Sequence, residues 1–120
     1  MPKKVLVVDD DLVNLKMLQS RLLKKGFKVT VAIDGEGGLR KLEEAPPDLI
    51  ILDVKMPNMN GYTFVLELRK LKKFDHIPII VLTAYNELKP IFKFNNVRDY
   101  IVKPVNFDRL FKKMNACLKG

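Results

Sequence analysis

The stretch VLVVDDDLVN, residues 5–14, runs from four apolar side chains directly into three consecutive carboxylates. Like charges held this close repel each other, by roughly 3 kcal/mol for two unit charges about 5 Å apart at an effective dielectric constant near 20. A chain that needed only to end a strand could use glycine or asparagine instead. The acids Asp9, Asp10 and Asp11 therefore indicate that something in the folded protein compensates their charge.

The composition limits the class of protein. The 120 residues, 48% hydrophobic and 30% charged, are typical of a single globular domain that buries roughly 65% of its unfolded surface. One cysteine, Cys117, has no partner for an internal disulfide, and one cysteine with one histidine cannot form a zinc cluster. The apolar runs are too short for a signal peptide or for a membrane span of roughly 20 residues. We expect one domain over residues 1–120, in the cytoplasm and without membrane insertion.

The formal net charge of +8 raises the question of nucleic-acid binding, because clustered lysine and arginine side chains attract phosphates regardless of base sequence. Here the basic residues are scattered along the chain, and we place most of them on solvated helix faces. A helix-turn-helix or a similar DNA reader would need residues beyond those that the fold already uses. No direct nucleic-acid binding is expected.

Strand-like and helix-like patterns alternate along the chain. Apolar or β-branched runs predict strands over residues 5–9, 28–33, 49–53, 79–83 and 100–102. Helices are expected between them, ending at Gly26, running from Asp34 to just before Pro46, and covering residues 62–72, 87–94 and 107–118. The fourth should be short or irregular, because Pro90 falls inside it. This alternation predicts a doubly wound, flavodoxin-like α/β fold with helices on both faces of a five-stranded parallel sheet.

Acids close two of the predicted strands. Asp9 and Asp10 follow the first strand, and Asp53 ends the third. In open parallel sheets, ligands bind beyond the carboxyl ends of the strands at a switch point, which for the order 2-1-3-4-5 lies between strands one and three. Adjacent strands lie roughly 4.8 Å apart. These acids can therefore share one small site, with Thr83 and Lys103 arriving from the fourth and fifth strands.

Carboxylates without histidine or cysteine form an oxygen-only site, which prefers Mg²⁺ or Mn²⁺ to zinc or copper. Mg²⁺ usually binds through one or two carboxylates together with a phosphate, so the site suits phosphoryl chemistry. A carboxylate can itself be the nucleophile and form an aspartyl-phosphate without a general base, because it is already ionised. Lys103 could neutralise the transferring oxygens, and the Thr83 hydroxyl could donate a hydrogen bond to one of them.

Four motifs, taken in their order, resemble those of the response-regulator receiver domain: VLVVDDD, LIILDVKMPNMNG, IIVLTA and YIVKP. The match covers essentially the whole chain. The resemblance implies a five-stranded α/β domain that takes a phosphoryl group from a sensor histidine kinase or a histidine phosphotransfer protein, with Mg²⁺ required. It implies that Asp53 is the acceptor. Asp10 would bind Mg²⁺ directly, Asp9 would bind it through water, and the backbone carbonyl of Lys55 would be a further ligand.

The resemblance also implies roles around the acceptor. Thr83 would bond a phosphoryl oxygen, Ala84 would leave room beside it, and Lys103 would pair with the phosphate. The bond from Lys103 to Pro104 would be cis, a conformation accessible before proline. Phosphorylation would draw Thr83 inward and let Tyr100 of the fifth strand turn inward behind it. Such a switch biases two conformations that already exist.

Neighbouring residues carry further hypotheses. Tyr85 and the Lys55 side chain either shield the aspartyl-phosphate from water or are simply solvated loop residues. Asp11 is expected to cap the first helix rather than to bind metal. One apolar set either faces the kinase or packs in the core: Leu12, Leu15, Val105 and Phe107.

Two other functions fit parts of the pattern. A haloacid-dehalogenase-type phosphatase begins with an Asp-x-Asp motif that Asp9 and Asp11 imitate, but the threonine and the later acid pair of that family are missing here. A receiver-like scaffold that works through protein contacts alone would have little reason to keep clustered acids. The preferred hypothesis is a receiver domain over residues 1–120 without a separate output domain. It would be a signalling domain rather than an enzyme, and it would switch binding to a downstream protein.

Overall fold

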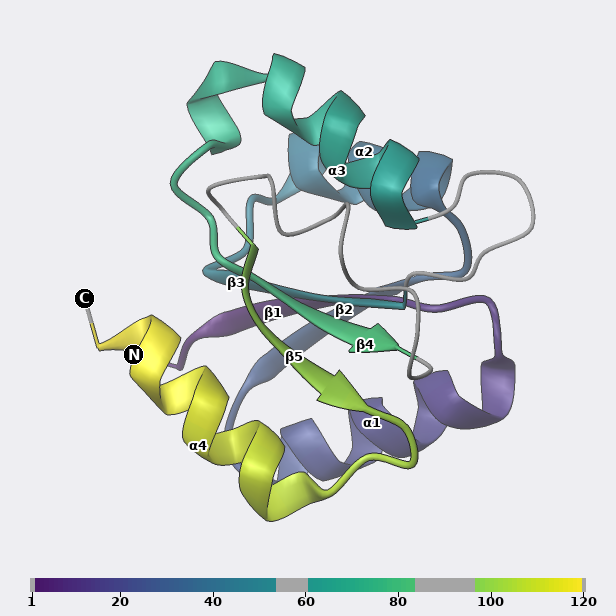
Figure 1. The fold of residues 1–120 in the computed structure, drawn as a ribbon, viewed down its shortest axis with the longest axis vertical. Helices are drawn as coiled ribbons and strands as arrows, with labels where there is room; N and C mark the ends of the chain where they lie inside the picture. Colours follow the sequence, from purple (N-terminus) through teal and green to yellow (C-terminus); the bar gives the residue numbers. More distant parts are fainter. Residues whose placement is uncertain (1, 54–60, 84–96, 120) are drawn as a thin grey trace.

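The computed structural model describes residues 2–53, 61–83 and 97–119. Its five strands form one parallel sheet in the order β2-β1-β3-β4-β5, which confirms the predicted topology (Figure 1). The strands are β1 (Lys4–Val8), β2 (Lys28–Ala32), β3 (Leu49–Asp53), β4 (Ile79–Thr83) and β5 (Val97–Val102). The expected helix over 87–94, together with Lys55, Ala84 and Tyr85, lies outside the described residues.

The described helices cover both faces of the sheet, as the alternating pattern predicted. Helices α1 (Leu12–Lys24) and α4 (Phe107–Leu118) lie against one face, and α2 (Gly35–Glu44) and α3 (Gly61–Lys70) lie against the other (Figure 1). A short 3₁₀ helix, η1 (Lys72–Phe74), follows α3. Within the described ranges, no helix is long and apolar enough to cross a membrane.

The strands β1 and β2 differ from their predicted bounds by one residue at one end or both, and two elements differ by more. A single helix was expected over residues 62–72, but α3 ends at Lys70 and η1 takes over, with the Phe74 amide donating to the Leu71 carbonyl at 2.9 Å. This tighter turn carries Phe74 back into the core, where it is buried. Strand β5 begins at Val97, three residues earlier than expected, because Val97 and Ile101 both pack inward while the charged Arg98 between them obscures the pattern.

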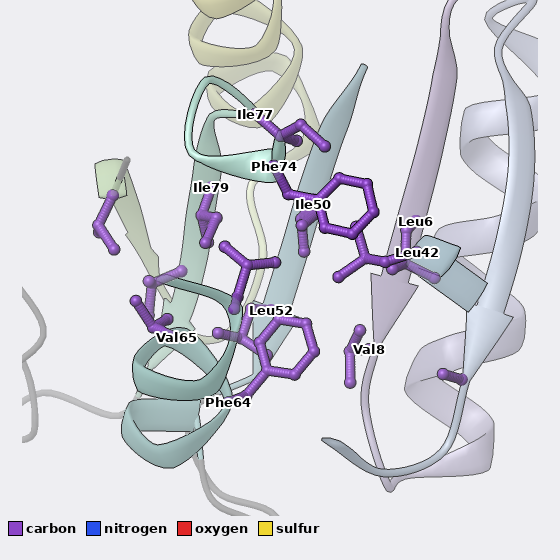
Figure 2. Close-up of a cluster of buried hydrophobic side chains, with 14 residues drawn as sticks. Leu6, Val8, Leu42, Ile50, Leu52, Phe64, Val65, Phe74, Ile77 and Ile79 are labelled. Atoms are coloured by element: carbon purple, nitrogen blue, oxygen red, sulfur yellow. The ribbon is translucent and has the colours of Figure 1, made fainter. Parts of the chain in front are cut away.

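The core lies in two layers, one on each face of the sheet. Figure 2 shows the layer under α2 and α3, where Phe64 extends from α3 towards Leu52 of β3 and Val8 of β1. The other layer joins the opposite side chains of the same strands to α1 and α4. Because successive side chains of a strand point to opposite faces, β1 and β3 are buried on both sides. The acids that follow them are therefore held on a rigid support.

Gly38 of α2 lies close to side chains of α3 and β1. A Cβ atom there would lie 2.8 Å from Cε1 of Phe64 and 3.1 Å from Cγ2 of Val8. Both neighbours are fully buried and cannot swing aside easily. Glycine in a helix interior costs about 1 kcal/mol relative to alanine, so close packing explains why it is used here.

We expect Gly38→Ala to destabilise the protein by about 1–2 kcal/mol, because overpacking of a filled core outweighs the gain in helix propensity. Urea unfolding at equilibrium measures the change. In the double variant with Phe64→Leu, which trims the clashing ring, the loss should be smaller than the sum of the single losses. A more stable Gly38→Ala protein would contradict the close packing.

Candidate phosphoryl-acceptor and metal site

Three carboxylates meet where β1 and β3 end. Asp9 and Asp10 follow β1, and Asp53 is the last residue of β3. One carboxylate oxygen from each lies within 4.8 Å of the other two. Asp9 and Asp53 are buried, whereas Asp10 is exposed. The parallel register sets this arrangement, since Val8 pairs with Leu52 and so brings the two strand ends level.

Lys103 and Thr83 join the same edge of the sheet. The Lys103 ammonium donates to Oδ2 of Asp53 at 3.0 Å, and its side chain is 32% exposed. Its backbone amide donates to the carbonyl of Thr83 at 3.0 Å, so the two residues lie side by side at the ends of β4 and β5. Thr83 is fully buried. The Lys103–Pro104 bond is cis, as the resemblance implied.

The start of α1 holds Asp9 in place. Oδ1 of Asp9 accepts from the Asp11 amide at 2.9 Å, and Oδ2 accepts from the side-chain amide of Asn14 at 3.3 Å. Asp11 caps α1, accepting from the amides of Val13 at 3.0 Å and Asn14 at 3.3 Å. The expected role of Asp11 as a helix cap is thus confirmed. The sequence reasoning did not identify Asn14; its only signal was a polar side chain three residues after the cap.

The negative charge of the acid cluster is only partly compensated within the described residues. The pKa of Asp9 is raised from 3.8 to about 6, mainly by burial and also by the charge of the neighbouring Asp53 carboxyl and a hydrogen bond shared with it. The Asp11 amide and the Lys103 ammonium pull the pKa of Asp9 the other way without offsetting the rise. One lysine therefore does not balance the three acids.

The donor set fits a hard divalent cation. Each acid offers an oxygen ligand, and no described histidine or cysteine belongs to the cluster. Mg²⁺ and Mn²⁺ prefer such oxygen ligands, and a bound dication would favour the ionised form of Asp9. Asp9, Asp10 and Asp53 are the residues able to hold the metal.

The other residues that the sequence singled out differ in how far they are buried. Tyr100 of β5 is 39% exposed, with the Lys113 ammonium 5.8 Å from its ring centre, so its side chain does not point inward here. Leu15 and Phe107 are buried in the core, which decides against a kinase-facing role for these two, whereas Leu12 is exposed. Lys55, Ala84 and Tyr85 lie outside the described residues.

Comparison with known proteins agrees with the fold and identifies the family. Residues 5–115 match the family model of the response regulator receiver domain. The chain is 33% identical to protein PilH of Pseudomonas aeruginosa, over 98% of both chains. It is 36% identical to the transcriptional regulatory protein AfsQ1 of Streptomyces coelicolor, covering 99% of this chain but 52% of AfsQ1.

Among solved structures, chemotaxis protein CheY4 of Vibrio cholerae superimposes with a TM-score of 0.91 at 34% identity, covering 98% of this chain and all of CheY4. The chain belongs to the response regulator receiver domain family of two-component signalling. This is a family of signalling domains rather than of classical enzymes. The chain spans about half the length of several curated relatives and nearly all of PilH.

We expect Asp9→Asn to stabilise the metal-free protein at pH 7.5. The folded state holds the Asp9 proton more tightly than the unfolded state, so this group's stabilisation is complete below about pH 4 and is lost as the pH rises through about 6. Ionised Asp9 then costs up to about 3 kcal/mol, which the asparagine avoids. Urea unfolding of both proteins in EDTA should show a gain of about 1–3 kcal/mol at pH 7.5 that shrinks towards pH 4.5.

Mg²⁺ provides the matching control. Millimolar Mg²⁺ should stabilise the wild type at pH 7.5 by mass action and should have a smaller effect on Asp9→Asn. If the wild type and Asp9→Asn in EDTA differed in unfolding free energy by the same amount at pH 7.5 and at pH 4.5, Asp9 would not be the titrating group.

Proposed function

We propose that this chain is a stand-alone response regulator that accepts a phosphoryl group on Asp53 from a histidine kinase or a histidine phosphotransfer protein. The observation that carries the proposal is the position of Asp53, buried at the end of β3 among two more acids, with the Lys103 ammonium 3.0 Å from its Oδ2. The cytoplasm, where such donors present their phosphohistidines, is the proposed compartment.

The transfer needs one nucleophile and one leaving group. A carboxylate oxygen of Asp53 attacks the phosphorus atom of a phosphohistidine, and an O–P bond forms as the P–N bond breaks. The electron pair of the broken bond stays on the imidazole nitrogen of the donor, which then takes up a proton. A carboxylate nucleophile needs no base to activate it, and the Lys103 ammonium lies 3.0 Å from Oδ2 of Asp53, where it can meet the incoming group.

Lys103 and Thr83 would act on the oxygens of the transferring group. Lys103 reaches the Asp53 carboxylate from the solvent side, and it can shift its ammonium onto a phosphoryl oxygen as that oxygen gains charge. Thr83 ends the strand next to β3 and can donate a hydrogen bond from its hydroxyl. Thr83 ends β4 and Lys103 directly follows β5, so the sheet positions the backbone that carries both groups.

Mg²⁺, or Mn²⁺ in its place, would be held by Asp9, Asp10 and Asp53. The Lys55 carbonyl, which the resemblance adds to this set, lies outside the described residues. When bound, the metal would supply positive charge for the phosphoryl oxygens. Asp9 and Asp10 then bind the cation rather than take part in bond formation, which leaves Asp53 as the nucleophile.

The proposed output is a change at β5. Tyr100 lines a hollow of about 430 Å³ together with three basic side chains, Arg109, Lys112 and Lys113. If phosphorylation draws Thr83 towards the phosphoryl group and Tyr100 turns inward, this surface changes its shape and exposed charge. Thr83 and Tyr100 belong to neighbouring strands, β4 and β5, which supports coupling between them. A downstream protein would read the altered surface.

The proposed donor contacts α1. Leu12, Val13 and Met17 are 58%, 78% and 42% exposed on this helix. They lie just beyond Asp11, which caps α1 and whose amide binds Asp9. An apolar surface next to the acids suits a partner that must bring its phosphohistidine to Asp53.

Intact mass after incubation with acetyl phosphate and Mg²⁺ tests the acceptor. We expect the wild type to gain one phosphoryl group, because the ionised Asp53 attacks small phosphodonors as well as protein donors. Asp53→Asn, and the wild type in EDTA, should gain none.

Two results would favour other functions. A scaffold would be favoured if the protein gained no mass with acetyl phosphate or with a set of purified histidine kinases, and if Mg²⁺ left its melting temperature unchanged. Repeated turnover of a phosphomonoester such as p-nitrophenyl phosphate would favour a phosphatase.

Lys103→Ala separates the lysine's role in transfer from metal binding. We expect phosphorylation by acetyl phosphate to slow by about 10- to 100-fold, since a charge that stabilises the transferring oxygens is gone. Mg²⁺ affinity should stay equal or rise, because a positive charge has left the acid cluster. Quench-flow mass spectrometry and Mg²⁺ titration measure the two effects.

The matched control is Lys73→Ala, which removes a surface lysine that pairs with Glu43 at the same distance, 3.0 Å. This variant should behave as the wild type in both measurements. An equal loss of rate and of Mg²⁺ affinity in Lys103→Ala would show instead that the lysine only supports the structure of the site.

A further inference from the structure

The outer side of β2 is an open edge of the sheet. β2 pairs with β1, and no other described strand lies beyond it. The Lys28 amide donates to the Lys3 carbonyl at 2.9 Å, and the Ala32 carbonyl accepts from the Asp9 amide at 3.0 Å. Because every second residue of a strand bonds to the same neighbour, the backbone groups of Val29 and Val31 face away from β1. These two residues present donors and acceptors for another strand.

Two hollows border this edge along its length. One, of about 400 Å³, is lined by Lys4, Leu23, Lys28, Val29, Thr30 and Ala45. The other, of about 350 Å³, continues past Val31 and Ile33 to the side of α2. Leu23 and Ile33 are 53% and 56% exposed. An added strand would therefore find apolar surface near both ends of β2.

The charge beside the edge is positive. Lys4 and Lys28 line the first hollow, and no acid is among its lining residues. The second hollow has both signs, but its acids are engaged within the chain. Asp34 accepts from the Gly37 amide at 2.7 Å, and Glu44 lies 3.9 Å from the Lys41 ammonium. The charge pattern favours an anionic occupant.

We propose that the β2 edge docks an extended, acidic segment of another protein, which adds to the sheet as a further strand. Its backbone would pair with Val29 and Val31, its carboxylates would meet Lys4 and Lys28, and its apolar side chains would cover Leu23. Two copies of this chain paired through β2 would bring two positive borders together. Lysine on an edge strand is a common protection against such self-pairing.

Two synthetic peptides with blocked ends test the proposal on the unphosphorylated chain without Mg²⁺, so the result does not depend on the function of Asp53. One peptide alternates glutamate and valine over eight residues, and the other alternates lysine and valine. In amide NMR spectra of the labelled protein, the acidic peptide should shift Val29 and Val31 most. It should also slow hydrogen exchange at these amides at least tenfold, whereas the basic peptide should do neither.

Changes to the peptide and to the protein separate backbone pairing from charge. An acidic peptide with every amide N-methylated keeps its side chains but has no backbone N–H to donate, and it should not bind. Val31→Pro removes an outward amide while leaving the bonds to β1, and it should abolish binding in a folded protein. Lys28→Glu should weaken binding about three- to fivefold, the size of an exposed ion pair.

The matched control is Lys72→Glu. Lys72 is an exposed lysine of η1 that lines neither hollow, so this variant makes the same charge change and should leave peptide binding unaltered. Absence of shifts at Val29 and Val31 with millimolar acidic peptide would overturn the proposal. Equal binding of the N-methylated peptide would also overturn it, because backbone pairing would then play no part. Concentration-dependent dimer mass with shifts at the same amides and no peptide present would assign the edge to a second copy instead.

Discussion

The close approach of buried carboxylates where β1 and β3 end is the constraint on which the site depends. Asp9 and Asp53 are taken out of water and held within reach of each other and of Asp10, and the pKa of Asp9 rises to about 6 as a result. Lys103 compensates part of this charge through its contact with Asp53. Such an arrangement stays in place only if the surrounding structure resists relaxing away from it.

The two-sided core supplies that resistance. The side chains of β1 and β3 from Val5 to Val8 and from Leu49 to Leu52 are all fully buried, and the register between the two strands leaves no freedom to slide the acids apart. A slip by one residue would move every side chain of the strand into the core layer on the opposite face, where the packing is different. On the side of the helices, Asp11 caps α1 and Asn14 binds Asp9, so the backbone after β1 is also fixed. Apolar packing thus stabilises a group of charges that is unfavourable by itself.

The sequence predicted the parts of this arrangement that follow from periodicity and strand ends. Alternation predicted a parallel sheet with helices on both faces, and the acids after residues 5–8 and 49–52 predicted the location of the cluster. The contact from Asn14 to Asp9 depends on the angle at which α1 leaves the loop, and local pattern carries no information about that angle. The early start of β5 was not predicted, because Arg98 and Asp99 interrupt the apolar run of this edge strand. The 3₁₀ helix η1 was not predicted either, because burial of Phe74 in the core overrides local helix propensity.

The unfavourable charge repulsion among the three acids also limits how the domain can switch between conformations. A cation or a phosphoryl group can bias two conformations only by the difference in its interaction with each. A cation held by the three acids would relieve their repulsion, and it would favour the conformation in which they lie closest together. Thr83 ends β4 and Lys103 follows β5, and the Lys103 amide donates to the Thr83 carbonyl. Under the proposed function, a change in charge at Asp53 would therefore reach β5 through these neighbouring strand ends, and the core would stay packed while Tyr100 changed position.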